Sequence, residues 1–301
     1  MAPDPTGIRF RIAADDVHAE ITQVGAALRA LTVDGVDLVP SYPDTSPTPA
    51  ASGIVLLPWP NRVAGGRWTH DGVTRQLAIS EPAYGNASHG LLRFMPYQPV
   101  AEEPHRVVLA ATVFPQTGYP FLLDSTVAYE VGPRGLTVTH EVVNRGTDAA
   151  PFALGTHPYV QLGGVPTAEL TIRLDAQTRF EVDERLIPTA QTPVDAATDL
   201  RAPRRLGDLS LDTAFGDLAR DDDGRVRTTL TAPDGRSVSL WQGPGFDYVQ
   251  VFTTDRYPGQ ELAVAIEPMT APANAFNSGQ DLRILAPGER WAGQWGIEYA
   301  P

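Results

Sequence analysis

The sequence predicts an all-β protein, a single large antiparallel β-sandwich, from three observations. Runs in which apolar and polar residues alternate recur along the whole chain, and Gly, Pro, Asn or Asp bounds each of them. The 301 residues include 27 glycines and 28 prolines, more than the average of about 12% for the two together, as many turns require. Helical periodicity is scarce. A chain of this length buries roughly 75% of its unfolded surface, enough for one large core.

The expected strands are rich in Val, Thr, Tyr and Phe, as is typical of sheets. Asp-Gly pairs at 34–35, 71–72 and 234–235 lie between such runs and predict hairpin turns. The strands expected most clearly are 106–113, 126–131, 136–143, 238–241, 248–252 and 262–266.

Two segments between these runs have a different character. Residues 204–220 could hold a turn or two of helix, and the charged run 220–224 predicts a solvated loop. Neither a repeat nor a linker divides the chain, so we expect one domain over residues 1–301.

The composition excludes several kinds of chemistry. The chain has no cysteine, which rules out disulfides, thiolate nucleophiles and Cys-ligated metal. All 23 basic residues are arginines, so Schiff-base catalysis and a P-loop lysine are also excluded. A net charge of −13 argues against nucleic acid as a partner. We expect no cofactor, since no glycine-rich nucleotide fingerprint is present either.

The N-terminal residues have neither a basic region nor an apolar stretch of a signal peptide. The longest apolar run, 54–57, is far shorter than the roughly 20 residues of a membrane span. We therefore expect a cytoplasmic protein without membrane contact, and its oligomeric state stays open.

Six histidines are the main candidates for acid–base chemistry. His140 lies in an alternating run and is expected to face the core or a cross-strand partner. The other structural candidates lie near turns among charged residues and are expected to be exposed: His18, His70 and His105.

His89 and His157 differ because Gly and Pro give each an unusual backbone setting. Gly90 follows His89, and His157 lies between Gly155 and Pro158. Taken alone, each histidine fits a structural role better than a catalytic one. Spacings typical of metal ligands are missing, so we expect no metal site.

Two further segments carry chemistry-bearing residues. Glu267 ends an apolar strand directly before a proline and is either a capping residue or a desolvated base with a raised pKa. Asn61 and Arg62 follow Trp59 in a proline-rich segment, a combination that suits a sugar. The alternative for Trp59 is packing in the core.

Four segments occur in an order that resembles the aldose 1-epimerase (mutarotase) family. They read Leu-Pro-Trp-Pro-Asn-Arg at 57–62, Ser-His-Gly at 88–90, Gly-Thr-His-Pro-Tyr at 155–159 and Ile-Glu-Pro-Met-Thr at 266–270. The similarity continues through 272–277 and 285–289, and covers nearly the whole chain. It implies the galactose mutarotase-like supersandwich, in accord with the expected β-sandwich.

The resemblance also implies an activity, the interconversion of the α and β anomers of a free hexose without a metal or redox cofactor. Glu267 would be the base, His157 the acid, and His89 would polarise the ring oxygen or anomeric centre. Arg62 and Asn61 would bind the sugar. Asp212, which could also be a loop cap, would bind hydroxyls.

Three alternatives remain at this point. A hexose-6-phosphate 1-epimerase needs a cationic pocket, to which Arg62 and Arg93 could contribute. A carbohydrate-binding domain without activity needs no acid–base trio. Glycoside hydrolysis needs two carboxylates, and Glu267 is the only carboxylate that a motif supports.

Overall fold

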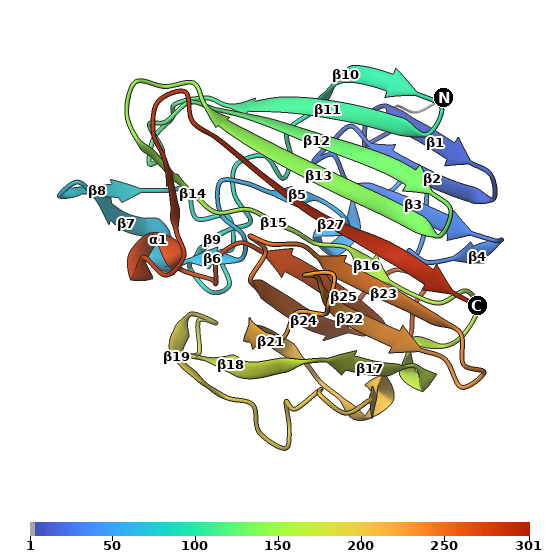
Figure 1. Cartoon of the computed structure of the whole chain (residues 1–301). Helices are drawn as coiled ribbons and strands as arrows, with labels where there is room; N and C mark the ends of the chain where they lie inside the picture. Colours follow the sequence, from blue (N-terminus) through green and yellow to red (C-terminus); the bar gives the residue numbers. More distant parts are fainter. Residues whose placement is uncertain (1–3) are drawn as a thin grey trace.

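Two large antiparallel sheets lie face to face in the computed structural model, which describes residues 4–301 (Figure 1). Strands hold 51% of the residues and helical turns 5%. The predicted all-β sandwich is therefore confirmed.

The first large sheet has nine strands, and its middle is built from long neighbouring strands. Their side chains alternate between buried and more exposed positions, as one solvated face requires. In spatial order the strands are β10 (Gln98–Glu103), β11 (Arg106–Val113), β12 (Leu123–Gly132), β13 (Gly135–Asn144), β27 (Arg290–Ala300), β23 (Ser237–Gln242), β22 (Val226–Thr231), β17 (Thr171–Leu174) and β20 (Arg204–Arg205).

The second large sheet has eight strands and carries the central strand β25, which is buried along its whole length. Its strands in order are β19 (Pro188–Pro193), β18 (Ala176–Val182), β21 (Asp212–Leu218), β24 (Tyr248–Thr254), β25 (Ala263–Met269), β15 (Gly155–Thr156) and β5 (Val55–Leu56), while β16 (Tyr159–Val160) pairs with β25 beside β15.

A four-stranded sheet from the N-terminal region contacts the part of the nine-stranded sheet formed by β11, β12 and β13. It contains β1 (Arg9–Ala14), β2 (Val17–Thr22), β3 (Leu28–Val33) and β4 (Val36–Asp37). Three two-stranded ladders complete the strands: β6 (Arg62–Val63) with β9 (Ala87–Ser88), β7 (Arg67–His70) with β8 (Val73–Gln76), and β14 (Ala150–Phe152) with β26 (Arg283–Leu285).

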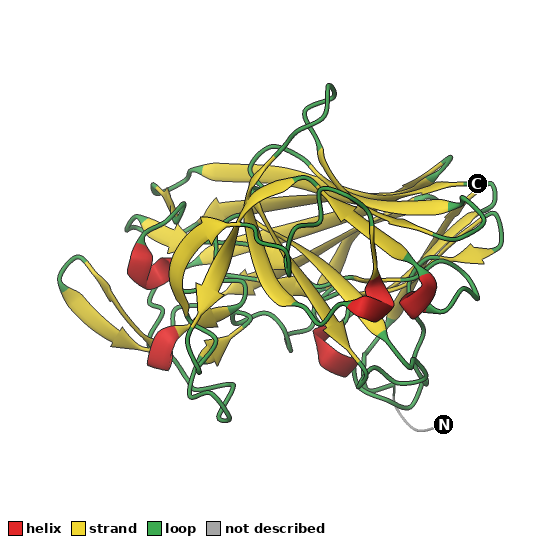
Figure 2. Cartoon of the chain, turned by 90° about the horizontal axis from the view of Figure 1, so that it is seen from below, coloured by secondary structure: helices red, strands yellow, loops and turns green. Residues whose placement is uncertain are grey.

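In the described part of the chain, helical structure is limited to single turns outside the layers of strands (Figure 2). They are α1 (Ala275–Ser278) and the 3₁₀ turns Pro49–Ala51, Ala64–Gly66, Thr167–Glu169 and Leu206–Asp208. Within residues 4–301, no helix has the length and apolar character needed to cross a bilayer.

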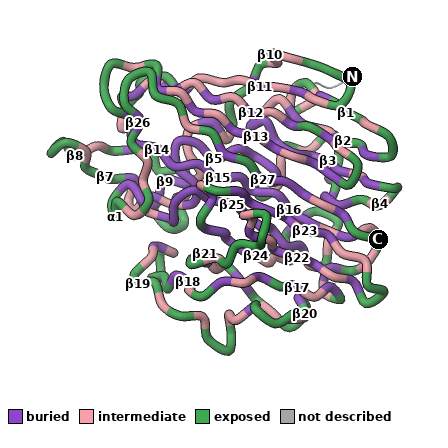
Figure 3. The backbone as a smooth tube through the Cα atoms, viewed as in Figure 1, coloured by how far each residue is buried: buried purple, intermediate pink, exposed green. Residues whose placement is uncertain are grey.

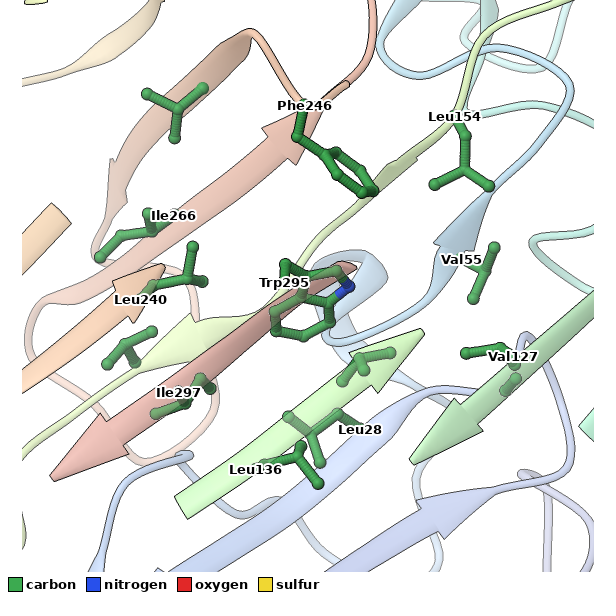
Figure 4. Packing of buried hydrophobic residues seen from close by; sticks show 14 of the residues in the cluster. Leu28, Val55, Val127, Leu136, Leu154, Leu240, Phe246, Ile266, Trp295 and Ile297 are labelled. Carbon is green, nitrogen blue, oxygen red and sulfur yellow. The ribbon is translucent and has the colours of Figure 1, made fainter. Parts of the chain in front are cut away.

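The core fills the space between the sheets, and the buried positions gather along the central strands (Figure 3). Trp295 of β27 lies at its centre, among residues from both layers (Figure 4). Leu136 and Leu240 reach it from the nine-stranded sheet, and Val55 and Ile266 from the eight-stranded sheet. Burying such side chains contributes about 1.5–3 kcal/mol each.

The strongest strand predictions are confirmed as β11, β12, β13, β23, β24 and β25, and the three Asp-Gly hairpins lie where the sequence placed them. The charged run at 220–224 is a mostly exposed turn, as predicted. Within 204–220, the helical turn that the sequence allowed is the 3₁₀ turn Leu206–Asp208. Residues 212–218 form β21, because β18 and β24 on either side take up their backbone hydrogen bonds.

The histidines outside the site follow the predictions with one exception. His140 is fully buried and accepts a hydrogen bond from Trp295 Nε1 at 2.9 Å. His18 and His105 are exposed. His70 was expected to be exposed but is half-buried, because its ring packs edge-on against Phe121 at 5.4 Å between centroids.

Candidate active site

A cavity of about 420 Å³ opens on the face of the eight-stranded sheet that points away from the core. Strand alternation explains its position, since Ile266 packs in the core and the next residue of β25 faces the opposite side. All six residues that the sequence singled out lie in its wall: Asn61, Arg62, His89, His157, Asp212 and Glu267.

The floor of the cavity comes from three adjacent strands. In the register of β24 and β25, Gln250 lies directly opposite Glu267, so both side chains point into the cavity. Asp212 begins β21, the next strand, and its Oδ1 accepts a hydrogen bond from Gln250 Nε2 at 2.5 Å. Asn61 Nδ2 reaches Gln250 Oε1 at 3.5 Å. Gln250 thus links the predicted binding residues at the floor.

His157 lies on the short connection between β15 and β16, where its backbone is fixed on both sides. Its N–H donates to Ile54 O, and its carbonyl accepts from Gly53 N–H. The imidazole stacks on Tyr159 with centroids 5.5 Å apart. This places Nε2 at 3.2 Å from Glu267 Oε1, and both side chains are buried.

His89 reaches the cavity from the ladder of β6 and β9. Its φ of 62° and the φ of 50° at Asn61 both lie in the left-handed region, and His89 N–H donates to Asn61 O at 2.8 Å. Gly90 is required next, because a Cβ there would lie 2.2 Å from Leu57 O. The His89 ring meets His157 edge-on at 5.5 Å.

Arg62 is oriented by a residue that the sequence did not single out. Its Nε and Nη2 donate to the two carboxylate oxygens of Glu81 at 2.8 and 2.9 Å, and Nη1 donates to Asn61 Oδ1 at 3.2 Å. A guanidinium has five N–H groups, so two remain for a ligand.

The burial of the acid–base pair shifts its protonation in opposite directions. Burial raises the pKa of Glu267 well above its usual value; the charge of Asp212 adds to this shift and Arg62 opposes it. Burial lowers the pKa of His157 to about 4, and the charges of Arg93 and Arg62 also act in that direction, against a backbone hydrogen bond. Both shifts favour a neutral carboxyl beside a neutral imidazole, the state in which the pair holds one proton.

Burial also lowers the pKa of His89 well below its usual value, and the neighbouring charges of His157, Arg93 and Arg62 act in the same direction. His89 keeps part of its surface open to the cavity. It is thus placed to offer a neutral imidazole to a ligand.

Several polar atoms around the pair have no hydrogen-bond partner among residues 4–301. They include Glu267 Oε2, His157 Nδ1 and His89 Nδ1. Buried polar atoms normally have partners, so unsatisfied ones at a cavity indicate ligand contacts. In the part of the chain that the structure describes, no group of three His, Cys, Asp or Glu side chains is arranged to hold a metal. The arrangement is suited to proton transfer at a polar ligand.

Two outcomes at the site concern residues outside the predicted set. Trp59 follows the alternative interpretation: it is buried, packs on Phe276 with centroids 5.6 Å apart, and does not line the cavity. Gln250 and Glu81 were missed. Gln250 was in a predicted strand, but the sequence does not show that it pairs with Glu267. No sequence pattern marked Glu81 as a site residue.

A family profile described as aldose 1-epimerase matches residues 9–298. The uncharacterized protein YihR of Escherichia coli K12 is 38% identical over 288 residues, covering 94% of this chain and 91% of that protein. Human galactose mutarotase is 28% identical over 221 residues, covering 66% of this chain and 62% of that protein.

Solved structures show the same fold at low sequence identity. The GalM/aldose epimerase homologue of Caenorhabditis elegans superposes with a TM-score of 0.85 at 20% identity, covering 97% of this chain and 98% of that one. Galactose 1-epimerase of Lactobacillus acidophilus superposes with a TM-score of 0.80 at 20% identity, covering 96% and 93%.

Proposed function

Because this chain belongs to the aldose 1-epimerase family, we propose that it interconverts the α and β anomers of a free hexose by acid–base ring opening and reclosure. The observation that carries the proposal is the buried pair of Glu267 Oε1 and His157 Nε2, 3.2 Å apart at a cavity of about 420 Å³.

Ring opening needs two proton transfers. The anomeric hydroxyl gives its proton to Glu267 while His157 protonates the ring oxygen, and the C1–O5 bond breaks to leave an aldehyde. Rotation about C1–C2 exposes the other face of the carbonyl. Reclosure returns both protons, so the enzyme ends in its starting state. Each positioned acid or base supplies roughly 10²–10⁴ in rate.

The proton inventory of the pair fits this cycle. A protonated Glu267 beside a neutral His157 holds the same number of protons as a carboxylate beside an imidazolium. One transfer over 3.2 Å interconverts the two forms. The pair can therefore present a base and an acid together although burial disfavours separate charges on each group.

The remaining residues bind the sugar. Asp212, Asn61 and Arg62 offer acceptors and donors to hydroxyl groups along one side of the cavity, with Gln250 bridging Asp212 and Asn61. His89 stands beside His157 and polarises the ring oxygen. A carbohydrate-binding domain without activity would have no use for the buried carboxyl–imidazole pair, which favours the enzyme.

Polarimetry of freshly dissolved α-D-glucose and α-D-galactose at low buffer concentration tests the proposal. We expect the approach to anomeric equilibrium to accelerate in proportion to protein concentration. If both sugars equilibrate at the rate of buffer alone, the proposed activity on a neutral hexose is wrong.

A further inference from the structure

Arg93 places in the cavity a positive charge that has no ion-pair partner among residues 4–301. It lines the same wall as His89 and His157, and it forms no ion pair with any of residues 4–301. Its Nε is buried without a hydrogen-bond partner among those residues. Its closest polar contact is Nη1 to Ser88 O at 3.5 Å. Binding the neutral hydroxyl groups of a sugar does not require a guanidinium without an ion-pair partner.

The guanidinium lies over the aromatic ring of its neighbour. Its Cζ lies 4.5 Å from the ring centroid of Phe94, which is itself 70% exposed beside the cavity. A cation–π contact of this kind uses none of the N–H groups of arginine, which stay free to bind an oxyanion. Burial lowers the pKa of Arg93, with Glu81 opposing, but a guanidinium stays charged.

The other charged residues of the cavity limit the charge of a ligand that Arg93 can bind. Arg62 is already paired in bidentate fashion with Glu81, and Gln250 covers an oxygen of Asp212. Among residues 4–301, Arg93 is thus the one arginine of this cavity wall without an ion pair. Arg93 alone balances one negative charge, so a phosphate dianion would leave one charge in the cavity uncompensated.

The order of residues along the wall defines which end of the sugar meets Arg93. Glu267 contacts His157, His89 meets His157 edge-on, and Arg93 reaches the backbone of Ser88, next to His89. With the anomeric hydroxyl at Glu267 and the ring oxygen at His157, the next atoms on the histidine side are C5 and its C6 substituent.

Resting on the proposed function, we propose that the preferred substrate is a hexose with a single negative charge on its C6 substituent, bound by Arg93. The chemical class is an aldose bearing a monoanionic carboxylate or sulfur oxyanion, as distinct from a neutral hexose or a phosphate ester.

The test compares three sugars of similar shape: D-glucose, D-glucose 6-sulfate and D-glucose 6-phosphate at pH 7.5, with D-glucuronate as the carboxylate probe. The exchange between anomers is followed by magnetisation-transfer NMR at low salt. We expect kcat/KM for glucose 6-sulfate and for glucuronate to exceed that for glucose. We also expect kcat/KM for glucose 6-sulfate to exceed that for glucose 6-phosphate. Equal values for glucose and the monoanions, or a preference for the dianion, would overturn the proposal.

Variants assign the effect to Arg93. Arg93→Gln is expected to lower kcat/KM for 6-sulfate and glucuronate by about 10- to 100-fold, as loss of a charged hydrogen bond predicts, and to change glucose less than about threefold. Arg93→Lys is expected to restore part of the loss. Arg134→Gln, in the exposed turn between β12 and β13, removes the same charge away from the cavity and is expected to change nothing. Equal losses on all sugars would reduce Arg93 to a positioning residue.

Calorimetric binding separates this proposal from the proposed activity. If no sugar is epimerised, the activity is wrong, yet tighter binding of 6-sulfate than of glucose, abolished in Arg93→Gln, would still support the anion site. If binding shows no such preference, the anion site is wrong whatever the activity.

Discussion

Asp212 binds substrate in this account without taking part in proton transfer. It lies at the exposed start of β21, with one oxygen occupied by Gln250 and the other available to a sugar hydroxyl. We expect Asp212→Ala to raise KM by roughly tenfold, as loss of a charged hydrogen bond predicts, with kcat within a few-fold of wild type.

Steady-state kinetics over a range of sugar concentrations separates these two effects. Asp208→Ala removes an exposed carboxylate from a nearby 3₁₀ turn outside the cavity and serves as the matched control. If Asp212→Ala lowered kcat as strongly as the loss of Glu267, its role would be in the chemistry.

The shared proton of Glu267 and His157 predicts a bell-shaped dependence of kcat/KM on pH. The pair gains a second proton, and loses its base, as pH falls through the pKa of His157 near 4. It loses its last proton, and its acid, as pH rises through the raised pKa of Glu267. Rates corrected for buffer catalysis, with circular dichroism at each pH, check this. An acid limb near 6.5, the ordinary histidine pKa, would contradict it.

The loop elements that hold His89 depend on one glycine. Gly90 has a φ of 73°, and a Cβ there would meet the backbone of Leu57 at 2.2 Å. Gly72 has a similar φ of 75° in an open hairpin with nothing within 4 Å, so it isolates the cost of the backbone conformation. That cost is about 1–2 kcal/mol.

We expect Gly90→Ala to destabilise the protein by clearly more than Gly72→Ala and to lower activity, because His89 is displaced. Urea unfolding of both variants measures the difference. Equal stability of the two would mean that the loop relaxes freely around Leu57.

Among the elements, strands were predicted correctly where apolar and polar residues alternate strongly. The prediction failed where pairing with neighbouring strands determines the structure. β11, β12 and β13 alternate clearly and were expected. Residues 212–218 have no such signal, and they form a strand because β18 and β24 supply partners on both sides. Such pairing is a long-range property that a local pattern does not encode.

For the molecule as a whole, buried titratable groups make stability depend on pH. His140 has a pKa lowered to about 3 by burial, and His157 to about 4, so unfolding is favoured as pH falls below 6.5, where the unfolded histidines bind protons. Glu267 acts in the opposite sense. Its raised pKa means that its contribution is fully present below the unfolded value and is lost as pH rises.

Glu267→Gln removes this opposing contribution. Relative to wild type, the free energy of unfolding of the variant is therefore expected to increase as pH rises above the ordinary glutamate pKa. Urea unfolding of wild type and Glu267→Gln at several pH values measures, for each protein, the slope of the free energy of unfolding against pH. Parallel slopes would mean that Glu267 is ionised normally in the folded protein.

The residues of the cavity show how much of the site could be predicted from the sequence. Motif order singled out Glu267 and His157, which lie 110 positions apart and yet meet at 3.2 Å. Gln250 and Glu81 carry no motif, and only the assembled sheets show that the first lies opposite Glu267 and the second orients Arg62. The spatial partners of a predicted residue were thus beyond local patterns.

The anomeric exchange of saturating D-glucose by Glu267→Gln, compared with wild type, tests whether Glu267 is the general base. We expect the rate to fall by at least about 10²-fold, as for loss of a general base, while calorimetry shows that sugar binding is retained. A variant that kept more than about a tenth of the wild-type rate would contradict the assignment of Glu267 as the base.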